Sequence, residues 1–160
     1  MIYILMVIAV VFLETKIKNY MEMNRQLGER QEILNSKIII RKHYNRGMFL
    51  NYLEDKKEMV KTISCVFLGL FLLLFVIMLP KNGNKLFKLG LSLSLGGAIS
   101  NVTDRLNRGY VVDYFSFNCK QLKSIVFNLA DMFIILGAFF TTLSSVFNTK
   151  GKRCTNEAAK

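Results

Sequence analysis

Residues 124–149 read SIVFNLADMFIILGAFFTTLSSVFNT, a mostly apolar run in which Asp131 is the one charged residue. A second run, residues 62–79, reads TISCVFLGLFLLLFVIML and contains no charged residue. A helix rises about 1.5 Å per residue, so roughly 20 residues cross the apolar core of a bilayer, which is about 30 Å thick. Both runs have about this length, and they predict a membrane protein.

Two weaker apolar segments, residues 1–13 and 89–103, reach spanning length when the apolar stems of their charged flanks are counted. The first can also be a cleaved signal peptide, but it has no basic n-region and no A-x-A-like site. We interpret it as a retained helix. The prediction is an all-α membrane fold in a single domain, residues 1–160. Its four transmembrane helices are expected at about residues 2–20, 62–80, 86–107 and 124–147.

The net charge is +11, and basic proteins bind nucleic acids as well as membranes. No helix-turn-helix, zinc-finger or RNP pattern is present, and most Lys and Arg lie between the apolar runs. Anionic membrane lipids are therefore the expected partners, and nucleic acid is not. The three cysteines form no C-x-x-C pair, so we predict neither a disulfide framework nor a metal site.

The charged loops predict an orientation in the membrane. Residues 80–85 read PKNGNK, a tight basic connector between the second and third helices, and the tail after residue 149 is also basic. Basic loops stay in the cytoplasm, so both termini are predicted to be cytoplasmic.

The segment between the first two helices, residues 14–61, would then lie outside despite its own positive charge. Long loops follow the charge rule less strictly, so the orientation stands. Within this segment, residues 37–41 and 48–53 can form a small extracytoplasmic β-like segment, although such brief apolar runs also fit helix.

Acidic residues are scarce in the second half of the chain. After Glu58, three of the four acids, Asp104, Asp113 and Asp131, fall in or beside the last two predicted helices. In the predicted orientation they gather at the outer membrane face, with Asp113 in a short loop. Asp131 would lie about six residues into the fourth helix, roughly 9 Å below its start. A carboxylate there needs a partner inside the bundle, and Asn128 shares its helix face.

Two carboxyl groups close together in an apolar site cannot both ionise, so they share one proton. One can then deprotonate water while the other protonates a scissile carbonyl, as in aspartic proteases, without a metal or cofactor. Structural interpretations stay open. A buried aspartate can pair with Arg105 or Lys123, Asp104 can serve the helix end beside Arg105, and Asp113 alone is typical of a solvated loop. His43 has no neighbouring pattern that suggests a triad.

Three short motifs follow one another on the last two predicted helices. Residues 96–105 read GGAISNVTDR, residues 108–114 read RGYVVDY, and residues 127–131 read FNLAD. They match the patterns G-x-x-x-N-x-x-D-R, G-x-V-x-D and N-x-A-D in this order. The chain therefore resembles signal peptidase II, the bacterial lipoprotein signal peptidase family, which is also similar in length and in its four spans.

The resemblance implies a catalytic dyad of Asp113 and Asp131. It also implies supporting or substrate-binding roles for Asn45, Gly47, Gly97, Asn101, Asp104, Arg105, Asn128 and Ala130. Residues 45–49, NRGMF, are similar to a family segment N-x-G-A-A-F, with a methionine in place of a small residue. At the first helix the family has an Asp four residues before a Lys, whereas this chain has Glu14 and Lys18. That pair either supports the site or is an exposed interfacial anchor, worth about a few tenths of a kcal/mol.

The function that the resemblance implies is that of an aspartic endopeptidase in the bacterial cell membrane, with its site towards the outer face. Its expected partners are a lipid-modified prolipoprotein, cut just before the diacylglyceryl-cysteine, and cyclic peptide inhibitors of the globomycin type. No cofactor is expected. Two other classes stay open: a non-catalytic four-helix paralogue that binds lipid or lipopeptide, and a small ion-coupled transporter that uses Asp131 alone.

Overall fold

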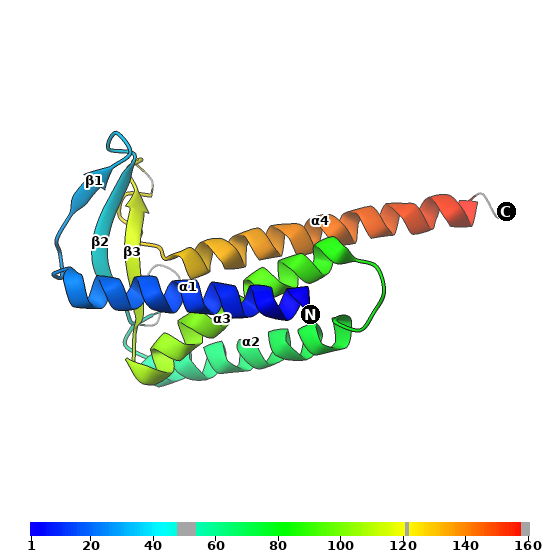
Figure 1. Cartoon of the computed structure of the whole chain (residues 1–160), viewed down its shortest axis with the longest axis horizontal. Coiled ribbons are helices and arrows are strands. Elements are labelled where there is room, and N and C mark those ends of the chain that lie inside the picture. Colours follow the sequence, from blue (N-terminus) through cyan, green and yellow to red (C-terminus); the bar gives the residue numbers. More distant parts are fainter. Residues whose placement is uncertain (48–53, 121, 158–160) are drawn as a thin grey trace.

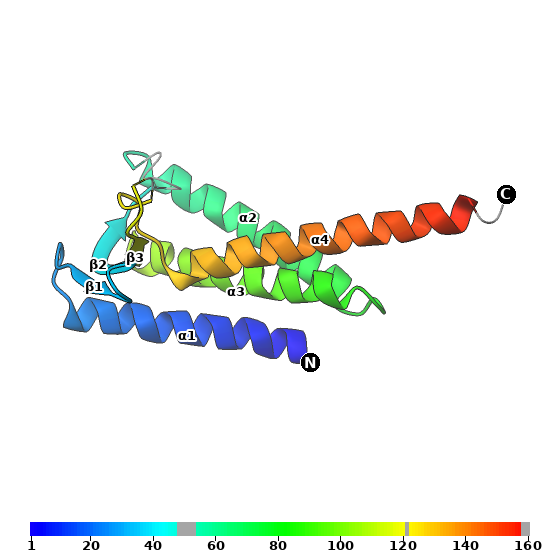
Figure 2. The same cartoon turned by 90° about the horizontal axis from the view of Figure 1, so that it is seen from above.

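The computed structural model describes residues 1–47, 54–120 and 122–157, with side chains up to residue 147. Four helices run along one another: α1 (Ile2–Asn24), α2 (Lys57–Met78), α3 (Lys85–Asn107) and α4 (Leu129–Glu157). Helix α3 is central and contacts the other three (Figures 1 and 2). The start of α1 and the end of α4 lie at the end of the bundle away from the sheet (Figure 1).

Within the described chain, two helices are long and apolar enough to cross a membrane, Lys57–Met78 and Leu129–Phe147. Helix α2 turns apolar side chains outward, among them Phe67, Leu70 and Leu73. Helix α3 is less apolar because it packs mainly against other helices, and most of its residues from Lys88 to Asp104 are buried. That α1 and α3 also cross the membrane stays a prediction.

Small residues bring α3 and α4 close together. A Cβ atom added at Gly97 would lie 2.5 Å from the carbonyl oxygen of Ala130. About two helical turns away from this contact, a Cβ atom added at Gly137 would lie 2.4 Å from the carbonyl oxygen of Gly90. Glycine at such positions lets two helix backbones approach to a distance that no side chain allows.

A three-stranded antiparallel sheet covers one end of the bundle (Figure 1). Its strands are β1 (Gln31–Ile33), β2 (Ile38–Asn45) and β3 (Val111–Phe117), in the order β1-β2-β3. The predicted strand near residues 37–41 is confirmed, and residues 48–53 lie outside the described residues.

The prediction that Asp113 lies in a short loop is wrong, because the sheet extends beyond the segment between α1 and α2. Strand β3 comes from the connection between α3 and α4, where Asp113 was expected in a loop. Its sequence, VVDYFSF, is rich in β-branched and aromatic residues, which suit a pleated, half-buried surface. Val112, Tyr114 and Phe115 are buried with Met21 of α1 in the core of this end.

The predicted start of the fourth helix is also wrong. Helix α4 begins at Leu129, because residue 127 is still extended: the backbone N–H of Phe127 donates to the carbonyl oxygen of Phe115 at 2.7 Å. Asp131 therefore lies in the first helical turn and not about six residues below it.

Candidate active site

Asn128 connects the two aspartates. Its side-chain amide donates to Asp113 Oδ1 at 2.6 Å. Its side-chain oxygen accepts the backbone N–H of Asp131 at 2.9 Å, and its own backbone N–H donates to Asp131 Oδ2 at 3.2 Å. These two reciprocal bonds form a capping box, which satisfies donors that a helix start leaves unpaired. The first residue of the N-x-A-D motif, Asn128, thus caps the start of α4 and also hydrogen-bonds to both aspartates.

Asp113 is almost completely buried, with 1% of its surface exposed. The side-chain amide of Asn45 donates to Asp113 Oδ2 at 3.1 Å, so each carboxyl oxygen faces an amide. Burial, reinforced by the nearby charge of Asp131, raises the pKa of Asp113 to about 7. Near neutral pH this group can therefore exchange a proton.

Asp131 is held from the α3 side. Asn101 donates its side-chain amide to Asp131 Oδ1 at 2.9 Å. The side-chain oxygen of Asn101 accepts a 2.8 Å hydrogen bond from Lys18 Nζ. An ammonium group can only donate, so Lys18 must contact the oxygen of the Asn101 amide. This orients the NH₂ group of Asn101 toward Asp131.

Lys18 and Glu14 are both buried, so the interpretation of this pair as an exposed interfacial anchor is wrong. Lys18 Nζ lies 3.4 Å from Glu14 Oε2 and 3.1 Å from Asp104 Oδ2. Glu14 Oε1 accepts a 2.6 Å hydrogen bond from the hydroxyl of Tyr114. The pair is the centre of a polar network that links α1, α3 and β3.

Asp104 belongs to this supporting network. Besides Lys18, it binds the backbone N–H of Val112 at 3.2 Å and Arg108 Nε at 3.3 Å. Arg105 instead donates to two carbonyl oxygens, those of Gly47 at 3.1 Å and Asn101 at 3.4 Å. In the described part of the chain no ion pair joins Arg105 or Lys123 to an aspartate, which contradicts that structural alternative.

The remaining predicted residues fall into two places. The backbone N–H of Gly47 donates to the side-chain oxygen of Asn45 at 3.1 Å, so both belong to the contacts around Asp113. Gly97 and Ala130 form the close contact between α3 and α4 just below Asp131. Their role in the structure is to set the spacing between α3 and α4.

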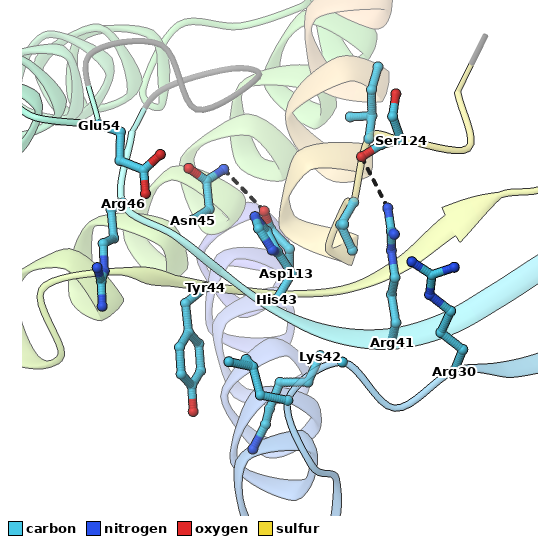
Figure 3. A pocket seen from close by; sticks show the side chains of 14 residues that line it. Arg30, Arg41, Lys42, His43, Tyr44, Asn45, Arg46, Glu54, Asp113 and Ser124 are labelled. Carbon is cyan, nitrogen blue, oxygen red and sulfur yellow. Dashed lines mark hydrogen bonds between the residues drawn. The ribbon is translucent and has the colours of Figure 1, made fainter.

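A cavity of about 710 Å³ opens beside the dyad, with Asp113 in its wall. Figure 3 shows Asp113 facing it together with Asn45, His43 and other side chains of β2. His43 lies opposite Asp113 in the sheet register. Among the described residues no group of three or more His, Cys, Asp or Glu could hold a metal ion. The arrangement places the Asp113 carboxyl group, which is close enough to Asp131 to be affected by its charge, in the wall of an open cavity.

Sequence reasoning missed Tyr114 and undervalued Lys18. The Tyr114 hydroxyl donates to Glu14 and accepts the backbone N–H of Leu129 at 3.0 Å, so it ties α1 to the start of α4. A glutamate and a lysine four residues apart, directly after the apolar run of the first helix, were the available signal. The tyrosine offered none, because its partners lie far away in the sequence.

The fold matches solved structures of bacterial membrane enzymes. One structure, determined by the in meso method at 2.3 Å, superposes with a TM-score of 0.82 at 24% identity, over 94% of this chain and 90% of that chain. A second, at 1.9 Å, gives a TM-score of 0.75 at 24% identity over 89% and 90%. The class defined by this fold is that of a four-helix bundle with a small antiparallel sheet at one end, and the chain shares its fold with these structures.

Sequence comparison gives the family. The family model for signal peptidase (SPase) II matches residues 6–147. A lipoprotein signal peptidase of Caldanaerobacter subterraneus subsp. tengcongensis is 38% identical over 103 residues, 64% of this chain and 67% of that protein. One of Fusobacterium nucleatum subsp. nucleatum is 28% identical over 156 residues, 96% and 91% of the two chains. The chain belongs to the signal peptidase II family of membrane-associated proteases.

Proposed function

We propose that this protein is an aspartic endopeptidase that removes the signal peptide from diacylglyceryl-cysteine-modified prolipoproteins. The observation that carries the proposal is the joint contact of Asn128 with Asp113 and Asp131 beside an open cavity. Its substrate class follows from the family and from relatives named lipoprotein signal peptidase.

The reaction is hydrolysis by a carboxyl pair that shares one proton. The ionised member takes a proton from water, and the water oxygen attacks the carbonyl carbon of the residue before the cysteine. The protonated member donates to the carbonyl oxygen. As the C–N bond breaks, the carboxyl group that took the water proton gives it to the cysteine nitrogen, and its partner takes back a proton from a hydroxyl of the tetrahedral intermediate. The signal peptide then ends in a carboxyl group, the lipoprotein begins with a free amine, and the pair again holds one proton. This chemistry uses no metal or cofactor.

Asn101 and Asn128 position the pair, and Asn45 holds Asp113 at the cavity wall. Because Asp113 and Asp131 both carry hydrogen bonds from amides, their oxygens are oriented before substrate arrives, which lowers the reorganisation needed in the transition state. Asp104, Arg105, Gly47, Gly97 and Ala130 act through these residues in the proposal.

The proposed setting is the cytoplasmic membrane of a bacterium, with four spanning helices and the sheet at the outer face. The start of α1 and the end of α4 lie at the end of the bundle opposite the sheet, which is compatible with cytoplasmic termini and an outer site (Figure 1). A lipid-anchored substrate would reach the dyad by diffusing within the membrane. Cyclic peptides of the globomycin type would compete for the same site.

The test uses membranes that contain the full chain, its Asp113→Asn variant or its Asp131→Asn variant. Each is incubated with a diacylglyceryl-modified prolipoprotein, and product masses are followed with and without globomycin. We expect cleavage before the modified cysteine by the wild type alone, and inhibition by globomycin. Full activity of either variant would refute the dyad. An inactive but folded wild type that still binds the substrate would point to the binding paralogue, and an ion flux lost only with Asp131 would point to transport.

A further inference from the structure

Two arginines, Arg30 and Arg41, line the cavity beside Asp113. Figure 3 shows them next to each other, Arg41 on β2 and Arg30 just before β1, on the side where Arg41 reaches toward Ser124. The volume of about 710 Å³ lies within the range typical of ligand sites. The cavity therefore has Asp113, one of the two proposed catalytic residues, in its wall and a cationic end formed by the two arginines.

A bulge in β2 places Arg41 in this cavity. Ile40 pairs with Phe115 and His43 pairs with Asp113, so Arg41 and Lys42 together lie opposite Tyr114 alone. The extra residue in a bulge turns side chains out of the regular alternation. Lys42 turns to Glu22, 3.9 Å away, whereas Arg41 Nη2 donates at 3.0 Å to the carbonyl oxygens of Lys123 and Ser124. Those two bonds fix the guanidinium but leave its charge without a counter-ion.

The charges of Arg30 and Arg41 are not balanced within the described residues. No ion pair there involves either arginine, and Arg41 Nε is buried without a hydrogen-bond partner. Burial and, after it, the nearby charge of Arg30 lower the pKa of Arg41, as expected for two guanidinium groups whose like charges repel each other. A carboxylate between them would neutralise part of this positive charge and cancel the repulsion, because guanidinium groups bind such anions strongly.

We propose that Arg30 and Arg41 form a subsite for an acidic side chain in the polypeptide that follows the scissile bond. The inference rests on the proposed function. The lipid on the cysteine keeps the start of the product in the membrane, and the chain after it leaves past the sheet. Arg41 is two residues along β2 from His43, which faces Asp113. An extended chain rises about 3.3 Å per residue, so the acid is expected roughly two to four residues after the cysteine.

An acidic peptide fits the site better than an anionic lipid headgroup does. Asp113 lines the same cavity, so the occupant must be continuous with the peptide that reacts there. His43, which pairs with Asp113, lines the part of the cavity next to Arg41, and Asn45 lines the part beyond Asp113; a lipid headgroup at the arginines would leave both empty.

The test compares two lipid-modified peptides that are identical except for Glu or Gln at the second to fourth positions after the cysteine. For the wild-type chain we expect a KM about tenfold lower for the Glu peptide with a similar kcat, since a charge-assisted hydrogen bond is worth roughly one such factor. Arg30→Gln and Arg41→Gln should each abolish most of this preference. Lys120→Gln, which removes an exposed positive charge that does not line the cavity, should leave it unchanged.

Affinity for the same two peptides is also measured with the Asp131→Asn variant, where no cleavage is needed. Tighter binding of the Glu peptide that depends on Arg30 and Arg41 supports the subsite even if the proposed catalysis fails. Equal affinity for both peptides overturns it, whether or not the wild type cleaves them. Loss of binding to phosphatidylglycerol vesicles in the arginine variants, without any peptide preference, would also overturn it in favour of a lipid site.

Discussion

Asn128 donates a 2.6 Å hydrogen bond to Asp113, while its side-chain oxygen accepts the backbone N–H of Asp131 and so caps the helix that carries it. One fully buried amide therefore sets both the start of α4 and the relative position of the two carboxyl groups. The two tasks use different atoms: the NH₂ group contacts Asp113, and the oxygen forms the cap. A substitution can separate them.

Asn128→Asp keeps an oxygen for the cap but loses the amide donor and adds a third carboxyl group next to Asp113. We expect kcat to fall by at least about a hundredfold, because a reacting group loses its orienting donor and gains a repelling neighbour. Asn128→Ala should lose the cap as well, which costs about 1 kcal/mol more of helix stability. Cleavage rates and thermal melting of the purified chain measure the two effects.

Asn118→Ala is the matched control for these two variants. Asn118 is another asparagine of the same end of the molecule, and its amide donates to the carbonyl oxygen of Ser36 at 2.7 Å. Its loss should leave kcat unchanged. If Asn128→Asp were as active as Asn118→Ala, Asn128 would have no role in the chemistry.

Activity should fall as the pH rises through about 7. Burial, and then the charge of Asp131, raise the pKa of Asp113 to about 7, so the proton needed by the carboxyl pair is lost above that pH. The measurement is kcat/KM between about pH 5 and 9. Asn45→Leu removes an amide that favours the charged form of Asp113, so it should move this decline upward by about one pH unit or less. A profile that is flat up to about pH 9 would contradict the assignment.

Stability should respond to pH through the same group. The unfolded chain loses the proton of Asp113 near 3.8, and the folded chain keeps it until about 7. Between these values the folded state binds more protons, so stability falls as the pH rises and becomes flat above about 7. Asp113→Asn removes this penalty, which is at most about 4 kcal/mol. Its melting temperature relative to wild type should therefore be higher at pH 8 than at pH 4, and an unchanged difference would argue against the raised pKa.

The long helices could be predicted from the sequence because hydropathy acts over many residues. The run at residues 62–79 corresponds to the greater part of α2, which ends at Met78, and the connector predicted at residues 80–85 separates α2 from α3, which begins at Lys85. The start of α4 could not be predicted this way, because Ile125 and Phe127 are as apolar as the helix that follows. Pairing of Phe127 with Phe115 decides that boundary, and such pairing depends on a distant strand.

The candidate site was predictable to the extent that its motifs are local. The N-x-A-D and G-x-V-x-D patterns gave Asn128, Asp131 and Asp113, all of which the fold brings together. The supporting role of Lys18 depends on contacts with Ser100 and Asn101, more than 80 positions away in the sequence. Hydropathy and spacing along one helix carry no information about such contacts.

Lys18→Met should destabilise the fold and reduce activity. It leaves Glu14 and Asp104 buried without their shared cation, and breaking a buried ion pair on one side costs about 3–5 kcal/mol. It also frees the amide of Asn101 to rotate away from Asp131. Thermal melting and cleavage rates are the measurements, and Lys16→Met, an exposed lysine of the same helix, is the control.

The double variant Glu14→Gln with Lys18→Met separates two roles of Lys18: balancing the charge of the buried carboxylates, and orienting Asn101. Removing one of the two stranded carboxylates should recover part of the melting temperature. Activity should stay low, because Asn101 still lacks the lysine that orients it. Recovery of both quantities together would mean that Lys18 acts only on stability.

Gly97→Ala should push α4 away from α3 and lower activity through the helix spacing. The added methyl group would lie 2.5 Å from the carbonyl oxygen of Ala130 and 2.9 Å from Ile134 Cγ1, and a backbone atom cannot move aside as a flexible side chain can. Overpacking of this kind costs about 1–3 kcal/mol. Because Ala130 directly precedes Asp131, the shift should also weaken the hydrogen bond from Asn101 and reduce kcat by about tenfold or more.

Gly69→Ala in α2 is the matched control. The added methyl group meets nothing within 4 Å, so this variant should keep full activity and gain up to about 1 kcal/mol of helix propensity. Equal melting temperatures and rates for the two variants would show that the close approach of α3 and α4 at Gly97 does not position the dyad.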